Sequence, residues 1–348
     1  MGISRGPPSS RAERDEVETP ISHQHHTLAT LLAAALTASG CAASKTVSDT
    51  KSDYALVDAC AADGDVSACE AACEVRVRAG CYLLGKAYAN GEGVERADDK
   101  AVMYYDRACE LGDPTGCAAV GVMVEGGRGA PKDPARAVRY YRRACDANQP
   151  SACANLGVAY QLGAVVPRDT LRASQLYQRA CVGGDPAGCA NLGYLLHYGI
   201  GVSRSPRRAR ELYVQACEAG YVRACGNLGT MALLGLGGPK QPNRAAILHR
   251  RACDGGVVES CGNLGVLYEH ALGAKRDLAK ARQLYDQACE AGSADACISL
   301  GGLYERGAGV TPNAEEARRL YRRACAAEDP VGCDRLDKLE ARSSKVGP

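Results

Sequence analysis

The chain has 348 residues, and its 42 Lys and Arg against 40 Asp and Glu give a formal net charge of +2 at pH 7. Because the basic residues are spread along the chain, the charge excludes a strong general field for nucleic acid or a membrane surface. One large globular core is also excluded, since Phe and Trp are absent while 17 Tyr and 40 Gly are present. This length and composition favour thin helix–helix contacts that are repeated many times.

An apolar run of small residues covers positions 27–40 and ends directly on Cys41. The run is too short for a transmembrane helix but suits the apolar part of an export signal. Its last residues, ASGC, resemble a bacterial lipobox, although Ala38 stands where leucine is preferred. We therefore predict an export signal over residues 1–41 with lipidation of Cys41, followed by a disordered linker over residues 42–53.

The rest of the chain is organised by a period of 36 residues. Seven full units span residues 81–332, and a half unit with a tail spans residues 333–348. Residues 54–80 contain the related sequence ACAADGDVSAC, with Cys60 and Cys69, and we interpret them as a degenerate N-terminal capping unit. A fixed period of about 20 to 50 residues is typical of stacked-repeat proteins.

One unit, residues 153–188, shows the elements within the period. Its first half predicts a short amphipathic helix over residues 154–162, and a Gly-rich loop follows. Asp169 marks the start of a second helix, whose apolar residues recur at i, i+3, i+4 and i+7 from Ala173. Gly183 then ends that helix. Each unit is therefore predicted to be an antiparallel helix pair.

Small residues recur at positions that predict close packing. The first helix carries a glycine four residues after its cysteine in every full unit: Gly85, Gly121, Gly157, Gly193, Gly229, Gly265 and Gly301. A glycine inside a helix costs about 1 kcal/mol relative to alanine, so we expect a neighbouring backbone to approach closely there. The second helix supplies matching alanines at Ala101, Ala137, Ala173, Ala209, Ala245, Ala281 and Ala317, and again at Ala108, Ala144, Ala180, Ala216, Ala252, Ala288 and Ala324.

Tyrosine recurs at one position of the second helix, where we expect core packing. The residues at this position are Tyr105, Tyr141, Tyr177, Tyr213, His249, Tyr285 and Tyr321. His249 replaces tyrosine in the fifth unit, and we expect it to be a core residue as well.

Eight cysteine pairs repeat with seven residues between the partners: Cys73 and Cys81, Cys109 and Cys117, Cys145 and Cys153, Cys181 and Cys189, Cys217 and Cys225, Cys253 and Cys261, Cys289 and Cys297, and Cys325 and Cys333. The first partner lies near the end of one helix and the second near the start of the next. Such a corner can bring two Cα atoms within the roughly 4.4 to 6.8 Å that a disulfide needs. Zinc binding is the competing interpretation, but no histidine recurs beside the pairs and four ligands would have to converge.

The extra pair Cys60 and Cys69 suggests a ninth bridge, although Cys69 and Cys73 also lie close enough in sequence to pair. Many structural disulfides indicate an oxidising compartment, which agrees with the predicted export. A single odd cysteine, Cys41, is then left for lipidation.

An asparagine recurs two residues after the second cysteine in four consecutive units: Asn155, Asn191, Asn227 and Asn263. A ladder of carboxamides is able to bind the backbone of an extended peptide. The alternative is that each asparagine caps or hydrogen-bonds its own unit. Neither interpretation is decided by the sequence.

The motif C-x-N-L-G-x-x-Y-x-x-G-x-G-V, continued by A-x-x-L-Y-x-R-A-C, resembles the Sel-like repeat, a relative of the tetratricopeptide repeat. The spacing of the cysteine pairs is similar to the Helicobacter cysteine-rich branch of that family. The resemblance covers residues 60–340. It implies an all-α, right-handed superhelical solenoid of helix pairs in which each cysteine pair is bridged.

The resemblance implies a scaffold that binds a protein, a peptide or a cell-envelope ligand on its concave face, without a cofactor or metal. The expected location is the bacterial periplasm, the outer membrane or the outside of the cell. Members of the cysteine-rich branch have also been classed as β-lactamases or penicillin binders. The S-x-x-K motif of Ser48–Lys51 lies in the predicted linker, and S-D-N and K-T-G are absent, so the residues favour no such enzyme.

A structural envelope protein without a specific ligand is a further alternative that the sequence leaves open. Four arginines of the last full unit, at positions 318, 319, 322 and 323, suggest an acidic partner or a solvated helix face.

Overall fold

The computed structural model describes residue 55, residues 57–60 and residues 65–345 of the chain. The predicted export signal, Cys41, Ser48–Lys51 and the predicted linker lie outside these residues. Throughout the described part, all regular secondary structure is helical.

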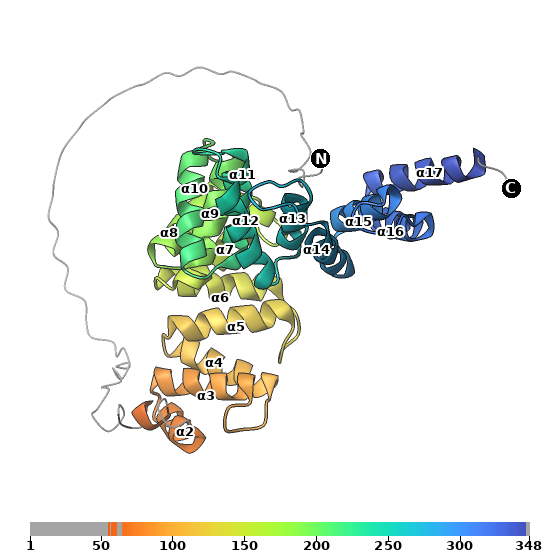
Figure 1. The fold of residues 1–348 in the computed structure, drawn as a ribbon. Helices are drawn as coiled ribbons and strands as arrows, with labels where there is room; N and C mark the ends of the chain where they lie inside the picture. The colour runs from red at the N-terminus through yellow and green to blue at the C-terminus, as the bar shows by residue number, and fades with distance from the viewer. Residues whose placement is uncertain (1–54, 56, 61–64, 346–348) are drawn as a thin grey trace, which may run out of the picture. The chain divides into compact units, whose positions relative to one another are not determined.

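Helices follow one another in pairs along the described chain (Figure 1). The first helix of each pair, called helix A, is α3 (Arg78–Asn90), α5 (Pro114–Gly126), α7 (Pro150–Leu162), α9 (Pro186–Tyr198), α11 (Val222–Leu234), α13 (Val258–Glu269) or α15 (Ala294–Arg306). The second, helix B, is α4 (Asp98–Glu110), α6 (Pro134–Asp146), α8 (Thr170–Val182), α10 (Pro206–Glu218), α12 (Pro242–Asp254), α14 (Leu278–Glu290) or α16 (Ala314–Ala326). Before these pairs stands α2 (Val66–Glu74), and α17 (Pro330–Lys345) follows them.

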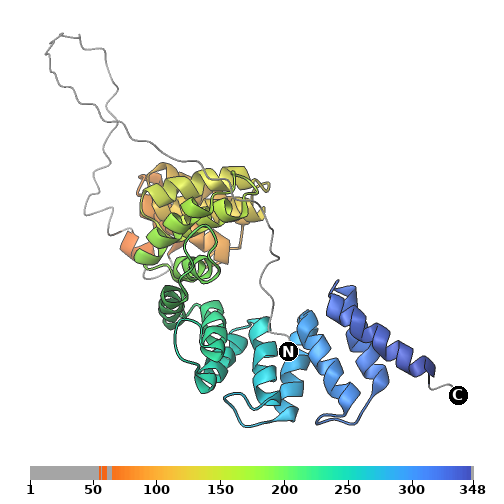
Figure 2. The ribbon, with the colours of Figure 1, turned by 90° about the horizontal axis from the view of Figure 1, so that it is seen from above.

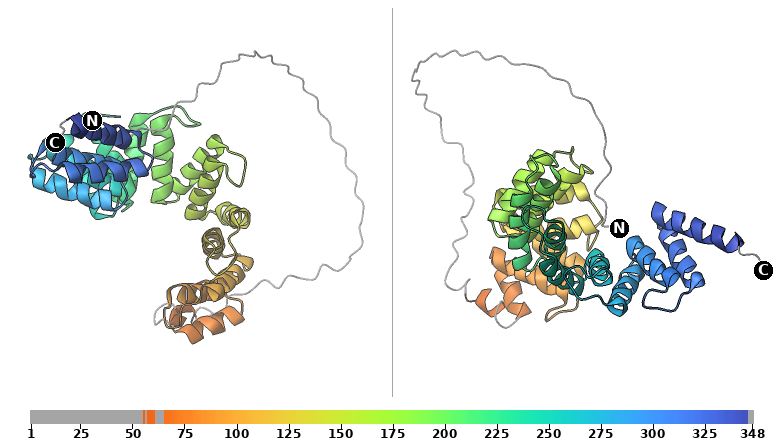
Figure 3. Two further views of the ribbon diagram at one scale, coloured as in Figure 1. Left: turned by 90° about the vertical axis from the view of Figure 1, so that its right-hand side faces the viewer. Right: turned by 45° about the horizontal axis from the view of Figure 1, so that its top comes forward.

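Each helix packs against the helix before it and the helix after it, so the pairs form a solenoid. The helices lie side by side within a pair (Figure 2), and the pairs follow one another in the order of the chain (Figure 3). Contacts between successive A helices also occur, as between α7 and α9. The expected all-α solenoid of helix pairs is therefore confirmed.

The start of helix A differs from the prediction by about one turn. We expected a helix over residues 154–162, but α7 begins at Pro150. Proline is well placed at the first position of a helix, because its missing N–H would have no partner there and its φ angle is already helical. The second cysteine of each pair therefore lies inside the first turn of helix A, and Cys153 is part of α7.

The boundaries of helix B agree with the sequence. Asp169 caps α8, since its carboxylate accepts a hydrogen bond of 2.8 Å from the backbone N–H of Arg172. At the other end Gly183 caps the helix, and Gly184 has a φ of +91° that favours glycine. The next helix A begins two residues later, at Pro186.

Glycines in the loop between helix A and helix B have a structural role. Gly199 ends α9 in the left-handed region, with a φ of +73°, and Gly201 has a φ of +67°. A Cβ atom on Gly201 would lie 2.0 Å from Oγ1 of Thr170, in the unit before. This loop therefore packs against the start of the preceding helix B, and only glycine fits.

The recurring glycine of helix A faces a ring, and our expectation of a close neighbouring backbone was wrong. A Cβ atom on Gly157 would lie 2.6 Å from Cε1 of Tyr177, which is on helix B of the same pair. The same relation joins Gly121 to Tyr141 and Gly301 to Tyr321. The glycine thus leaves room for a large flat side chain, and the helix A–helix B contact depends on this fit.

A close approach of backbones does occur, at a different position of helix A. A Cβ atom on Gly116 would lie 3.1 Å from the backbone nitrogen of Cys109 and 2.8 Å from Cβ of Ala108. This position immediately precedes the second cysteine, so helix A comes closest to the preceding helix B where the two cysteines meet.

The recurring tyrosines are buried and most of them have a polar partner. Tyr177, for example, is 0 % exposed and donates a hydrogen bond of 2.7 Å to Oε1 of Gln161 at the end of helix A. Hydroxyls at the same position donate to a glutamate in three other units: Tyr141 to Glu125, Tyr285 to Glu269 and Tyr321 to Glu305. Burial raises the pKa of all four phenols, so they remain neutral donors.

In the described chain the other three units, with Tyr105, Tyr213 and His249, lack this hydrogen bond. Among the described residues, the Tyr213 hydroxyl and Nδ1 of His249 are buried without a hydrogen-bond partner. His249 is 1 % exposed, and its burial lowers its pKa from 6.5 to about 4. Its ring packs against Gly229, as the tyrosine rings pack against their glycines. The expected core role of His249 is confirmed, and it places an ionisable group in the middle of the stack.

The variant G157A tests the contact between glycine and ring. We expect it to lower the free energy of unfolding by about 1–3 kcal/mol, because the new methyl overlaps Tyr177 and well-packed cores tolerate little added volume. The measurement is urea unfolding of the oxidised protein, followed by circular dichroism.

The matched control is G262A on α13, where the nearest atom to the added methyl is Cβ of Ala296 at 3.8 Å. That is an ordinary contact, so we expect G262A to be neutral or to stabilise by about 0.5–1 kcal/mol through helix propensity. Equal effects of the two variants would contradict a steric role for Gly157.

His249 predicts a loss of stability in acid. Because its pKa is lower in the folded state than the ordinary 6.5, the unfolded state binds the proton more tightly. The contribution of neutral His249 to the free energy of unfolding is therefore fully present above pH 6.5. It is lost as the pH drops from 6.5 toward 4, by up to about 3 kcal/mol. The measurement is urea unfolding at pH 7 and pH 4.5 for the natural chain and for H249Y.

The variant H249Y carries the residue of the other units and does not titrate in this range, so we expect it to lose less stability on acidification. The difference between the two proteins isolates the histidine from carboxylates common to both. An identical pH dependence would show that His249 makes no such contribution.

Candidate binding surface

Disulfides join each helix B to the next helix A. In the described chain they are Cys60–Cys69, Cys73–Cys81, Cys109–Cys117, Cys145–Cys153, Cys181–Cys189, Cys217–Cys225, Cys253–Cys261, Cys289–Cys297 and Cys325–Cys333. Their Cα–Cα distances run from 4.5 Å, as in Cys109–Cys117, to 4.9 Å in Cys60–Cys69, as a disulfide requires. The alternatives of a Cys69–Cys73 bridge and of zinc binding therefore do not apply to these cysteines.

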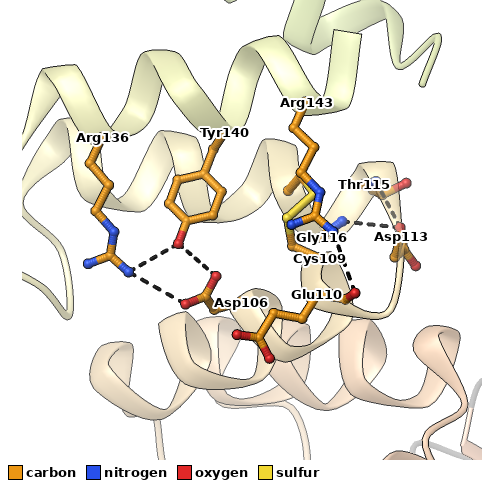
Figure 4. Close-up of a disulfide and its surroundings, with 10 residues drawn as sticks. Asp106, Cys109, Glu110, Asp113, Thr115, Gly116, Arg136, Tyr140 and Arg143 are labelled. Atoms are coloured by element: carbon orange, nitrogen blue, oxygen red, sulfur yellow. Dashed lines mark hydrogen bonds and ion pairs between the residues drawn. A yellow bond between two sulfur atoms is a disulfide. The ribbon is translucent and has the colours of Figure 1, made fainter. Parts of the chain in front are cut away.

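Side chains of one unit also reach the corner of the unit before it. In Figure 4, Arg143 on α6 donates to the carbonyl oxygen of Glu110 at 3.4 Å, beside the Cys109–Cys117 disulfide. The same contact joins Arg179 to the carbonyl of Cys145, at 2.8 Å. A cation at the end of a helix interacts favourably with its dipole, so each arginine ties two successive B helices together.

A second contact between units occurs one helical turn before Arg143 on α6. The hydroxyl of Tyr140 donates a hydrogen bond of 2.7 Å to Oδ1 of Asp106, and Arg136 donates to that hydroxyl at 3.0 Å (Figure 4). Disulfides thus fix each helix A on the helix B before it, while the arginines and this polar cluster join successive B helices.

The predicted binding residues lie on four consecutive A helices. Asn155, Asn191 and Asn263 are partly exposed and Asn227 is exposed. The helices that carry them are α7, α9, α11 and α13. The asparagine ladder is therefore present on one helix of each successive unit, and every member is accessible.

The other interpretation, that each asparagine caps or hydrogen-bonds its own unit, stays a prediction. No side-chain hydrogen bond of the four to their own units occurs in the part of the chain that the structure describes. Asn227 lies near the buried hydroxyl of Tyr213 in the unit before, but not in hydrogen-bond geometry. Their carboxamides therefore have donors and acceptors to offer to another molecule.

Apolar side chains accompany the ladder. On helix A, positions three and seven residues after the asparagine share its face, because the helix turns every 3.6 residues. The last of these positions is occupied by exposed apolar residues, with Leu162 68 % exposed, Tyr198 44 % and Leu234 40 %. Together with the four asparagines, these three residues are called the helix A strip.

The sequence did not identify the apolar part of the strip. Tyr198 packs against Tyr194, with ring centroids 4.7 Å apart, so two aromatic rings stand beside Asn191 on α9. The signal was available as a leucine or tyrosine seven residues after three of the four asparagines, but such residues are more often buried in a helix pair. Only the exposure of the side chains distinguishes the two cases.

The arginines of the last full unit are paired. Arg318 contacts Glu315, Arg319 contacts Glu316, Arg322 contacts Glu340 and Arg323 contacts Glu290. Of the two interpretations that the sequence left, these ion pairs support a solvated helix face.

Two other features, a metal-binding cluster and a membrane-spanning helix, are absent from the described residues. No group of three or more His, Cys, Asp or Glu side chains there is placed to hold a metal ion. Likewise no helix within that part is long and apolar enough to cross a membrane.

Repeated helix pairs of 36 residues with a bridged corner define a protein of the Sel-like solenoid class. The Sel1 repeat model matches seven consecutive segments, residues 78–113, 114–149, 150–185, 186–221, 222–257, 258–293 and 294–329. The chain belongs to the Sel1 repeat family. The matched units begin with helix A, three residues before the cysteine at which we began the count.

Solved structures show the same fold. A protective antigen of uropathogenic Escherichia coli, c5321, is 27 % identical with a TM-score of 0.68, and the match covers 85 % of this chain and 64 % of that protein. A Sel1 repeat protein of Oxalobacter formigenes is 25 % identical with a TM-score of 0.63, covering 70 % of this chain and 96 % of its own.

The cysteine-rich protein B of Helicobacter pylori is 33 % identical over 38 % of this chain and 96 % of its own, with a TM-score of 0.32. A comparison with curated protein sequences finds no match.

Proposed function

We propose that this protein is an exported scaffold that binds an extended segment of a partner protein along the helix A strip. The observation that carries the proposal is the asparagine ladder, with four accessible carboxamides that lack hydrogen bonds in their own units. An extended peptide has an unpaired N–H and C=O at each residue, and a carboxamide satisfies both kinds of group. The exposed Leu162, Tyr198 and Leu234 then supply apolar contacts for its side chains.

The rigidity of the stack supports this use. A surface that is held in place before binding loses little conformational entropy when the partner arrives. The disulfides and the arginine contacts between units hold successive A helices in register, so the ladder does not have to be assembled by the ligand. Repeat scaffolds of this kind offer an extended surface for a long partner segment.

Export is supported by the disulfides, because structural disulfides persist in oxidising compartments. The similar Escherichia coli protein is described as a protective antigen, which agrees with a location outside the cytoplasm. We further propose that Cys41 carries a lipid anchor at the mature N-terminus. Intact-mass analysis of protein recovered from membranes tests this: a chain beginning at an acylated Cys41 is expected, and an unacylated or uncleaved chain would contradict it.

The variant with alanine at all four asparagines tests the binding strip. We expect at least a tenfold loss in the amount of partner that the oxidised protein captures from envelope extract, because hydrogen bonds to a desolvated peptide backbone are lost at four places. The measurement is quantitative mass spectrometry of the captured proteins, with circular dichroism to show that the fold is intact.

The control variant removes three exposed amides from the B helices, as N243A/Q283A/Q287A, and is expected to capture the same partners as the natural chain. If the quadruple variant folds and captures its partners unchanged, the ladder is not the binding element. If the natural chain captures no specific partner, the result supports a purely structural role.

A further inference from the structure

Three arginines surround an open cavity of about 640 Å³ beside the loop that joins α7 to α8 in the third unit. Arg142 comes from α6, Arg168 from the loop after α7, and Arg172 from the first turn of α8. All three are exposed. One acidic side chain, Asp169, also lines the cavity, so its walls carry a surplus of positive charge.

A buried tyrosine holds two of these arginines in place. Arg142 donates a hydrogen bond of 3.2 Å to the hydroxyl of Tyr160, and the guanidinium of Arg172 lies over the ring of Tyr160, 4.6 Å from its centroid. Tyr160 itself is 5 % exposed. A guanidinium has five N–H donors, and the single bond to Tyr160 leaves Arg142 four of them for another molecule.

These arginines have no ionic partner. Neither Arg142, Arg168 nor Arg172 forms an ion pair within the described part of the chain. The Asp169 carboxylate accepts a hydrogen bond from the backbone of Arg172, as the cap of α8. In the last full unit, by contrast, every arginine on the exposed side of helix B contacts a glutamate.

The sixth unit contains the same arrangement with its cations engaged. There Arg250 donates to the hydroxyl of Tyr268, and Lys280 lies over the Tyr268 ring. Lys280 also contacts Asp277 at 3.2 Å, and Arg276, which corresponds to Arg168, donates to the carbonyl oxygen of Glu269 at 3.2 Å. Arg142 and Arg250 thus make the same contact with their tyrosines, and the two sites differ at the other two cations. In the described chain, Arg168 and Arg172 lack the carbonyl and carboxylate contacts that Arg276 and Lys280 make.

We propose that the cavity at Tyr160 is a second binding site, which takes the carboxylates of an acidic segment in a partner protein. Guanidinium groups bind carboxylates through paired hydrogen bonds, and one guanidinium at the hydroxyl of Tyr160 and one over its ring define where the carboxylate lies. Apolar atoms of Val166, Pro167 and Leu171 line the same cavity, and Leu171 is 57 % exposed. The occupant is therefore a peptide with acidic and apolar residues.

A peptide carboxylate fits the cavity better than a phosphate group. A phosphate carries close to two negative charges in a small volume and would have to approach the Asp169 carboxylate, which caps α8. Carboxylates with one charge each are able to contact Arg142 and Arg172 separately. The apolar side of the cavity also offers nothing to a free phosphate ion.

A neighbouring cavity lies in the next unit. A second cavity of about 390 Å³ is lined by Gln178, Leu196 and Arg208, and it lies next to the first along the loop after α9, since Gly201 lines the first cavity and Val202 the second. An extended segment of several residues thus has room beyond the carboxylate contacts. This surface is separate from the helix A strip, so the inference does not depend on the proposed function above.

The test measures the fluorescence anisotropy of a labelled peptide of alternating Glu and Leu on the oxidised full chain. We expect saturable binding that weakens with salt, and at least a tenfold rise in Kd for R142A/R172A. The matched control is R250A/K280A, which removes two charges at the equivalent site and should change Kd less than twofold. The asparagine quadruple variant should also bind the peptide normally.

Several results would overturn the proposal. These are an unchanged Kd for R142A/R172A, an equal loss for R250A/K280A, or equal binding of a peptide with Gln in place of Glu. Displacement of the peptide by inorganic phosphate at lower concentration than by acetate would assign the cavity to phosphate. Circular dichroism and the unfolding midpoint establish that the variants are folded, which is expected because both arginines are exposed.

Discussion

A covalent bond at each corner, between the end of helix B and the start of the next helix A, is the constraint on which the rest of the solenoid depends. The helix pairs have no Phe or Trp to bury, and their interfaces are built largely from alanine and glycine. A disulfide that closes a loop of about nine residues stabilises by roughly 2.5 kcal/mol in the chain-entropy description. Since the bond recurs in every unit, the contribution is distributed evenly along the stack and no unit depends on a large core.

The small residues at the helix interfaces are a consequence of that constraint. The short corner brings helix A so close to the preceding helix B that Gly116 faces the backbone of Cys109. Within a pair, space between the helices is needed instead of close approach, because a tyrosine ring must fit there. Gly157 leaves this space for Tyr177. A disulfide therefore joins helix A to the preceding helix B, and an aromatic ring packed against a glycine joins helix A to helix B of the same pair. His249 preserves the second contact in shape but not in hydrogen bonding.

The solenoid has two separate candidate binding surfaces, the helix A strip and the cavity at Tyr160. The helix A strip offers carboxamides and apolar side chains, which suit a peptide backbone. The cavity between α6, α7 and α8 offers guanidinium groups at Tyr160, which suit carboxylates. Both surfaces are fixed by contacts between units, such as Arg143 with the carbonyl of Glu110, and so both are ready before a partner binds.

The sequence by itself determined the period, the helix pairs and the corners that the cysteines occupy, because these depend on residues close together in the chain. Asp169 and Gly183, for example, mark the ends of α8 through contacts with their immediate neighbours. The start of α7 was misplaced by a turn, since a proline can either begin a helix or precede it.

The tertiary structure alone decided what the recurring glycines face and which arginines are paired with an acid. Gly157 and Tyr177 are 20 residues apart, and Arg322 meets Glu340 on α17, while Arg142 meets Tyr160. Arginines at 142 and at 322 occupy the same position of the repeat. Whether a charge is paired depends on side chains brought together from different units, and the sequence pattern of one unit does not contain that information.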